Sequence, residues 1–118
     1  MMRQLINKVQ LIGNLVSNPT CRVLESGKPV ARFSIATSEA YTTPDGRKVT
    51  ETQWHNVVAF DGPAMLAERF LAKGSRIALI GRLKSRKLDA PNGPARWTSE
   101  VVVNEFLMLG SRKSMAHP

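Results

Sequence analysis

The sequence predicts an all-β domain that contains one helix. In several stretches apolar residues recur at every second position, and turn residues such as Pro44-Asp45-Gly46 separate these stretches. Only residues 64–72 carry apolar side chains at helical spacing. The 118 residues, of which 42% are hydrophobic, suffice for a single core. We therefore expect one folded domain over residues 1–110, followed by a short, basic, disordered tail over residues 111–118.

Two strands are predicted near the start of the chain. In residues 7–15 the inward positions of the alternating pattern are Val9, Leu11, Gly13 and Leu15. In residues 30–38 the inward positions are Ala31, Phe33 and Ile35. Gly13 lies within the first pattern, where a glycine permits a bulge or a sharp bend. Residues 21–24 could add a short strand between the two.

The third predicted strand covers residues 53–60, and a loop over residues 39–52 joins it to the second strand as an extended hairpin. Alternation places Trp54 and Phe60 on one face and His55 on the other. For an isolated strand of this kind, large aromatic rings more often face the core. The orientation of this strand therefore depends on the features of the rest of the chain.

A helix and two further strands complete the prediction. Apolar side chains at helical spacing make up one face of the helix: Met65, Leu66, Phe70 and Leu71. Pro63 suits its first turn, and Lys73-Gly74 predicts its end. The last two strands are expected over residues 76–86 and 97–109. Five strands with one helix between the third and the fourth predict an OB-fold, a five-stranded Greek-key barrel in which one sheet face and two loops bind oligonucleotides.

The charge of the chain is unusually positive. Seventeen Lys and Arg residues against 9 Asp and Glu give a net charge of +8, which favours a polyanionic partner. A membrane partner has little support, because no apolar run approaches the ~20 residues that span a bilayer, and the N-terminus lacks the apolar core of a signal peptide. One stretch is especially basic, and we interpret it as one face of the fourth strand: Arg76, Arg82, Lys84, Arg86 and Lys87.

The sequence offers little for catalysis, metal binding or a cofactor. A single cysteine, Cys21, excludes an internal disulfide and fits a reducing cytoplasm. One Cys and two distant His residues, His55 and His117, cannot form a structural zinc site. The carboxylates are scattered, and no phosphate-binding glycine loop occurs. We therefore expect no enzyme activity, no metal and no cofactor, and we interpret His55 as structural.

Binding of single-stranded nucleic acid has more support. Such proteins combine a basic groove that follows the phosphates with aromatic rings on which bases stack. The basic strand supplies the first component, and Trp54, Phe60 and Tyr41 could supply the second. A packing role is about as consistent with Tyr41 as a stacking role, and for Trp97 we expect packing before binding.

The chain resembles the bacterial and organellar single-stranded DNA-binding proteins over about residues 5–110. The stretches that carry the resemblance are N-K-V-Q-L-I-G-N-L, F-S-I-A-T-S-E-A-Y, T-Q-W-H-N-V-V-A-F, L-A-K-G-S-R-I, G-R-L-K-S-R-K and E-V-V-V-N, in this order. The resemblance implies an OB-fold, a homotetramer, and binding and protection of single-stranded DNA in replication, recombination and repair. It also implies a location in the bacterial cytoplasm, associated with the nucleoid.

The resemblance assigns roles to individual residues. Base stacking falls on Tyr41, Trp54 and Phe60, and a subunit contact falls on His55. These assignments reverse the expectation for the isolated strand and place Trp54 and Phe60 on the outer, DNA-facing surface. The resemblance implies phosphate contacts at Arg82, Lys84, Arg86 and Lys87, and we also expect phosphate contacts at Lys8, Arg32 and Arg76.

The chain departs from this family at two places. Leu88 stands where a further stacking aromatic is common, and the basic sequence S-R-K-S-M-A-H-P stands where typical members continue toward an acidic tip. We therefore expect no recruitment of repair enzymes through an acidic tip. The alternative function is that of a primosome-type OB protein, which acts mainly by docking to replication proteins. Oligomeric state would separate the two, with a tetramer expected and a dimer favouring the alternative.

Overall fold

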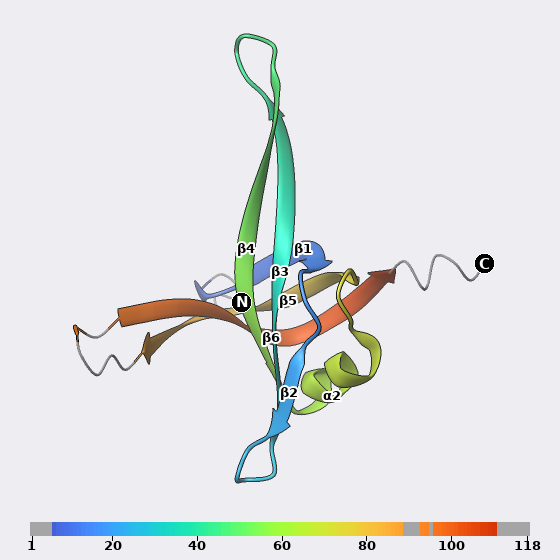
Figure 1. Ribbon diagram of the computed structural model, residues 1–118, viewed down its shortest axis with the longest axis vertical. Helices are drawn as coiled ribbons and strands as arrows, with labels where there is room; N and C mark the ends of the chain where they lie inside the picture. Colours follow the sequence, from blue (N-terminus) through green and yellow to red (C-terminus); the bar gives the residue numbers. More distant parts are fainter. Residues whose placement is uncertain (1–5, 89–92, 95, 111–118) are drawn as a thin grey trace.

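The computed structural model describes residues 6–88, 93–94 and 96–110. This part of the chain contains six strands and a helix, α2 (Figure 1). In chain order the elements are β1 (Val9–Leu15), β2 (Thr20–Val23), β3 (Pro29–Thr42), β4 (Lys48–Phe60), α2 (Asp61–Phe70), β5 (Arg76–Leu88) and β6 (Arg96–Gly110). The predicted strands and the helix are thus present, and the predicted short strand over residues 21–24 corresponds to β2, which ends at Val23. The predicted tail over residues 111–118 lies outside the described residues.

The strands form one sheet that closes on itself. Their order is β1-β5-β6-β4-β3-β2, and a further pairing between β1 and β3 closes five of them into a barrel. All neighbouring strands are antiparallel except β4 and β6, which are parallel. This topology, with one helix between β4 and β5, confirms the predicted OB-fold. Strand β2 adds to β3 outside the closed barrel.

Gly13 lies where the barrel closes. It pairs with Ile77 of β5, and the next residue, Asn14, pairs with both Arg76 of β5 and Ala36 of β3. A Cβ atom on Gly13 would lie too close to the carbonyl oxygen of Ala36 for van der Waals contact. The glycine is therefore needed because two backbones approach each other closely at the closure.

The barrel interior is filled by the inward positions that alternation predicts. The fully buried members include Ile35, Val57, Ile77 and Leu79. In β6 the pattern changes, because the register shifts between Ile80 and Gly81 of β5 and leaves Asn104 without an opposite residue. A β-bulge of this kind reverses which positions face inward.

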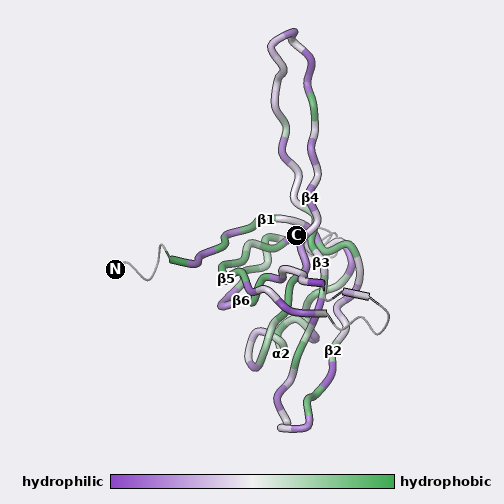
Figure 2. Tube along the Cα trace, turned by 90° about the vertical axis from the view of Figure 1, so that its left-hand side faces the viewer, coloured by the Kyte–Doolittle hydropathy of each residue, from purple (hydrophilic) through white to green (hydrophobic). Residues whose placement is uncertain are grey.

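The predicted loop over residues 39–52 is wrong in extent. The β3–β4 ladder continues without a register shift from Val30↔Phe60 to Thr42↔Lys48, so the hairpin turns only within residues 43–47. β-Branched residues along both arms favour this extended pairing. The hairpin projects well beyond the barrel (Figure 1) and is largely hydrophilic along its length (Figure 2).

The helix differs from the prediction at its C-terminus and in its buried face. It ends at Phe70, because Leu71 adopts an extended backbone (ψ 142°) that buries its side chain in the core. Gly74 has a positive φ of 93° but lies in the turn before β5, so it does not cap the helix. The small residues Ala64 and Ala67 face the barrel, while Met65, Leu66 and Phe70 are exposed.

Candidate nucleic-acid interface

One outer face of the barrel gathers outward side chains from four strands. Arg32 of β3 lies opposite Val58 of β4, Val58 lies opposite Val102 of β6, and Val102 lies opposite Arg82 of β5. The four residues therefore form one row across the sheet. The basic strand β5 is not adjacent to β4, since β6 lies between them. The valines of this row form a small second cluster with Val30.

Trp54 lies on this outer face and is 67% exposed. Its neighbours along the face of β4 are Asn56, Val58 and Phe60. His55, Val57 and Ala59 alternate to the other side, and Val57 and Ala59 belong to the main core. The orientation expected from the family resemblance is therefore correct for Trp54, and the orientation expected for an isolated strand is wrong.

Phe60 is less accessible than Trp54. It is half-buried against the outer cluster of Val30, Val58 and Val102. The ammonium of Lys28 lies 5.1 Å from the centroid of its ring, a cation–π distance. Lys28 also lies 3.7 Å from the carboxylate of Asp61. A base that stacks on Phe60 must therefore share the ring with Lys28, a residue that the sequence alone did not single out.

Tyr41 lies in the projecting hairpin, away from Trp54. It pairs with Val49, whereas Trp54 pairs with Ala36 five ladder positions nearer the barrel. Alternation along the unshifted ladder assigns Tyr41 to the face opposite that of Trp54. Its ring is 49% exposed and thus accessible. The structure therefore does not join the three predicted stacking aromatics into one flat platform.

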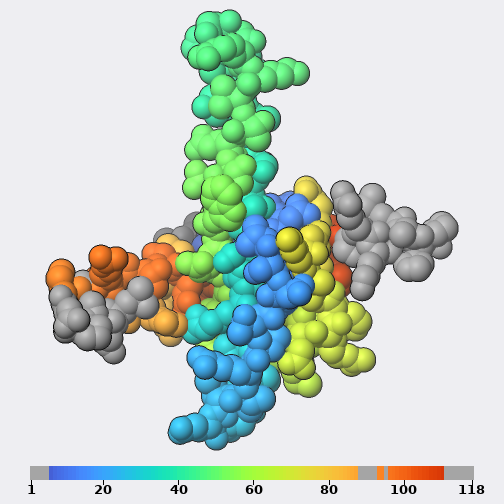
Figure 3. Space-filling view, in the orientation of Figure 1, coloured from blue at the N-terminus to red at the C-terminus, as the bar shows by residue number. Residues whose placement is uncertain are grey.

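The basic stretch of β5 divides between two faces. Arg82, Lys84 and Arg86 are exposed on the outer face that carries Trp54. Lys87 was predicted to share their face, but alternation turns it to the opposite one, where it pairs with Trp97. Trp97 is 68% exposed, so the expectation that it packs is wrong. The reason is that this part of the β5–β6 hairpin extends beyond the barrel (Figure 3).

Arg76 lies at the other end of β5 but still near Trp54. The ladder runs from Trp54 to Ala36, from Ala36 to Asn14, and from Asn14 to Arg76. The guanidinium of Arg76 donates a hydrogen bond of 3.4 Å to the side-chain oxygen of Asn14. The closure of the barrel through β1 and β3 therefore brings together two residues that are 22 positions apart in the sequence.

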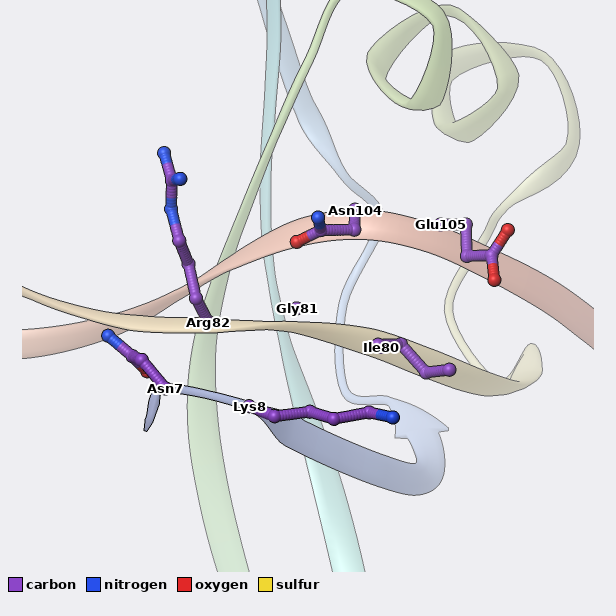
Figure 4. Close-up of a pocket in the computed structure, with 7 residues that line it drawn as sticks. All are labelled: Asn7, Lys8, Ile80, Gly81, Arg82, Asn104 and Glu105. Carbon is purple, nitrogen blue, oxygen red and sulfur yellow. The ribbon is translucent and has the colours of Figure 1, made fainter. Parts of the chain in front are cut away.

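Lys8 and Arg82 line the same pocket, which has a volume of about 500 Å³. Their charged groups point in different directions (Figure 4). The side chain of Asn7 holds this corner together, because it accepts a hydrogen bond from the Leu83 amide (2.8 Å) and donates one to the Leu83 carbonyl (2.9 Å).

A groove of about 340 Å³ lies between the β5–β6 hairpin, which carries the basic residues of β5, and the strands β3 and β4. Its lining is mainly polar and comes from five strands and the segment before β2: Ser17, Thr20, Arg32, Phe33, Ser34, Asn56, Val57, Arg86, Thr98 and Glu100. Within it, Arg32 donates a hydrogen bond of 2.7 Å to Glu100, and Ser34 donates one of 3.3 Å to Asn56. The sequence did not identify Asn56, Thr98 or Glu100, since only the sheet order brings them together.

His55 is half-buried and lies on the inward parity of β4. Its Nε2 atom is 3.0 Å from the hydroxyl of Thr37. This contact is consistent with a structural side chain. The predicted role in a subunit contact stays a prediction.

Among the described residues, Asp45 and Cys21 have pKa values shifted from their ordinary range. The described residues contain no group of three or more His, Cys, Asp or Glu side chains placed to hold a metal ion. At the tip of the β3–β4 hairpin, the Thr43 hydroxyl beside Asp45 lowers the pKa of that carboxyl. Burial, with a smaller effect from Glu68, raises the pKa of the Cys21 thiol. Neither group lies in the polar groove.

The described part of the chain includes no helix with the length and apolar character that crossing a membrane requires.

The fold and this face define the class: an OB-fold barrel whose outer surface combines an exposed tryptophan with a basic, polar groove. Residues 6–109 match the Single-strand binding protein family, and the chain belongs to this family. It is 40% identical over 107 residues to the single-stranded DNA-binding protein of Neisseria meningitidis, and the aligned part covers 91% of this chain and 62% of that protein. It is also 40% identical over 109 residues to single-stranded DNA-binding protein 1 of Xylella fastidiosa, with coverage of 92% and 80%.

Solved structures that are similar to this chain include single-stranded DNA-binding proteins. A structure described as the Plasmodium falciparum SSB complex with ssDNA superposes with a TM-score of 0.82 and 29% identity, covering 89% of this chain and 96% of that one. A deletion mutant of the single-stranded DNA binding protein from Thermus aquaticus superposes with a TM-score of 0.79 and 25% identity, covering 92% and 53%. The chain thus spans about three fifths of the Neisseria relative and about half of the Thermus chain.

Proposed function

We propose that this protein binds and protects single-stranded DNA with little sequence preference. The observation that carries the proposal is the outer face of the barrel, where the exposed ring of Trp54 lies beside a polar groove with Arg86 on its lining. Base–aromatic stacking tolerates any base, because each base has a π-face. The relatives named as single-stranded DNA-binding proteins, and the neighbour described with bound ssDNA, support this choice of ligand.

In this proposal the side chains of the outer face have separate tasks. Trp54 stacks on a base directly, and Phe60 offers a smaller ring on the same face. Tyr41 offers a more distant ring on the opposite face of the hairpin. The exposed cations of β5, which include Arg76, bind phosphates together with Lys8. The protein performs no chemistry on the DNA, and it acts during replication, recombination and repair in the bacterial cytoplasm.

We further propose that the protein assembles with copies of itself, as a homotetramer. An apolar row on the outer surface of β1, β5 and β6 supports self-association: Ile12 lies opposite Ala78, and Ala78 lies opposite Leu107. The side chains of Ile12 and Leu107 are 45% and 69% exposed in the single chain. Apolar side chains gathered in this way on a surface are typical of a protein contact. The predicted subunit contact of His55 belongs to the same proposal.

The test of DNA binding is a fluorescence titration with oligothymidylate at low salt. The chain has two tryptophans, both exposed, so each must be observed separately. In the Trp97→Phe variant Trp54 is the only tryptophan, and we expect strong quenching as bases stack on it. Absence of both quenching and retention on a DNA filter in this variant and in the unmodified protein would overturn the proposed function.

The primosome-type alternative makes a different prediction for the same titration. A protein that acts mainly through protein contacts would bind oligothymidylate weakly and would show little quenching of Trp54. The match of residues 6–109 to the single-strand binding family favours the first function over this alternative.

A further inference from the structure

The polar groove contains an ion pair between Arg32 and Glu100, although its surroundings are basic. We call these two residues, together with Asn56 and Thr98, the floor of the groove. Arg32 of β3 donates a hydrogen bond of 2.7 Å to Glu100 of β6, with β4 between the two strands in the sheet. The side chain of Glu100 is 11% exposed and that of Arg32 is 38% exposed. Glu100 also lies opposite Lys84 in the β5–β6 ladder. A nearly buried carboxylate is thus set among the cations that the proposed function assigns to phosphates.

We propose that Glu100 is an internal counter-ion for Arg32, so that the floor of the groove binds the edges of nucleobases while the phosphates follow the exposed cations at its rim. This proposal rests on the proposed function. It removes Arg32 from the phosphate contacts that the sequence predicts. Glu100 acts here as a positioning residue, because it holds the guanidinium of Arg32 in place.

The energetics of a buried charge support the assignment of Glu100 as a counter-ion for Arg32. If Arg32 turned to a phosphate, the carboxylate of Glu100 would lose its hydrogen-bonded partner while still largely excluded from water. Breaking a buried pair in this way is strongly unfavourable. The negative charge of Glu100 would also repel a phosphate placed on the floor.

The other groups on the floor support the proposal that the floor binds the edges of nucleobases. Asn56 accepts a hydrogen bond from Ser34 through its side-chain oxygen, which leaves its amide hydrogens for another acceptor. Thr98 adds a hydroxyl group beside Glu100. Neutral donors and acceptors of this kind match the edges of bases. The exposed cations Lys84 and Arg86 lie on the same outer face and are available to phosphates.

The dependence of DNA affinity on salt tests the charge assignment. On single strands, log K falls against log salt with a slope of about −0.7 for each phosphate that a cation neutralises. We expect Glu100→Gln, which frees Arg32, to steepen the slope by about 0.7. The double variant Arg32→Met/Glu100→Gln should return to the slope of the unmodified protein. Arg86→Met, a positive control, should make the slope shallower by about 0.7.

Glu68→Gln on α2 controls for the loss of one negative charge, and its slope should not change. The proposal is overturned if Glu100→Gln leaves the slope unchanged and the double variant has a slope shallower by about 0.7, because Arg32 would then already contact a phosphate. If Glu100→Gln does not fold, the unmodified protein and the double variant still give the decisive comparison. Absence of DNA binding by the unmodified protein would contradict the proposed function itself, and this proposal with it.

A second measurement tests the ligand of the floor. The double variant and the unmodified protein are compared on oligothymidylate and on an abasic strand of the same length. We expect the double variant to lose about two- to tenfold in affinity for oligothymidylate and to bind the abasic strand unchanged. An equal loss on both strands, or no loss on oligothymidylate, would show that the floor does not bind bases.

Discussion

At the scale of single residues, Trp54 is a position where a substitution should change DNA binding without changing the stability of the fold. Its ring is 67% exposed, so its removal creates no cavity in the core. The neighbouring Val57, on the opposite face of the same strand, is 2% exposed and belongs to the main core. We therefore expect Trp54 to contribute to DNA binding and Val57, three residues away, to contribute to the stability of the fold.

We expect Trp54→Ala to weaken binding of oligothymidylate by about 1–3 kcal/mol, the value of one stacked base, and to leave the melting temperature nearly unchanged. Val57→Ala is the matched control on the core face, and it should lower the melting temperature while preserving the stacking surface. Filter binding and thermal unfolding followed by circular dichroism measure the two effects. A fall in melting temperature for Trp54→Ala without a loss of affinity would contradict the outward assignment.

Cys21 gives a second prediction at this scale. Burial raises the pKa of its thiol, and the carboxylate of Glu68 raises it further. A raised pKa leaves less thiolate at a given pH, and the thiolate is the reactive species. We expect alkylation by iodoacetamide at neutral pH to be slower in the folded protein than in urea. Glu68→Gln should speed the reaction modestly, and a folded rate equal to the rate in urea would contradict the prediction.

At the scale of elements, the pairing of β1 with both β5 and β3 closes the barrel. Gly13 lies at this point, where a Cβ atom would press against the carbonyl oxygen of Ala36. We expect Gly13→Ala to lower the free energy of unfolding by about 1–3 kcal/mol or more, as overpacking does. Denaturation in urea measures this change.

Gly62, in the first turn of α2, is the control for this substitution. A Cβ atom there would have no neighbour within 4 Å. Gly62→Ala should therefore be neutral or should stabilise the protein by about 0.5–1 kcal/mol, since alanine restricts the unfolded chain. Equal destabilisation by the two variants would show that the close approach at Gly13 is not the cause.

At the scale of the whole molecule, the proposed assembly of four chains makes a prediction about mass. We expect light scattering to give a mass about four times the 13.0 kDa of one chain, and the same oligomer bound to a long oligothymidylate. A charged substitution in the apolar row, Leu107→Glu, should reduce this mass, because it places a carboxylate in the proposed contact. Asn104→Asp, an exposed position that the structure places nearby in β6, is the charge control and should preserve the tetramer. A dimer in the unmodified protein would favour the primosome-type alternative.

The local sequence determined most of the fold. Alternation gave the inward faces of β1 and β3, because a strand buried on one side requires apolar residues at every second position, whereas in β4 it separated two faces without deciding which one is buried. The order of the strands and the helix then predicted the OB-fold. The helix end was not predictable in this way, since the burial of Leu71 outweighed the local signal of Lys73-Gly74.

For the candidate site, the sequence determined which residue types were available: the exposed aromatic Trp54, the cations of β5 and an excess of positive charge. Only the tertiary structure decided which of them meet. The sheet order places β4 between β3 and β6 and brings Glu100 to Arg32 across 68 residues, and the closure through β1 brings Arg76 near Trp54. Pairings between distant strands depend on the register of the whole sheet, which no local pattern contains.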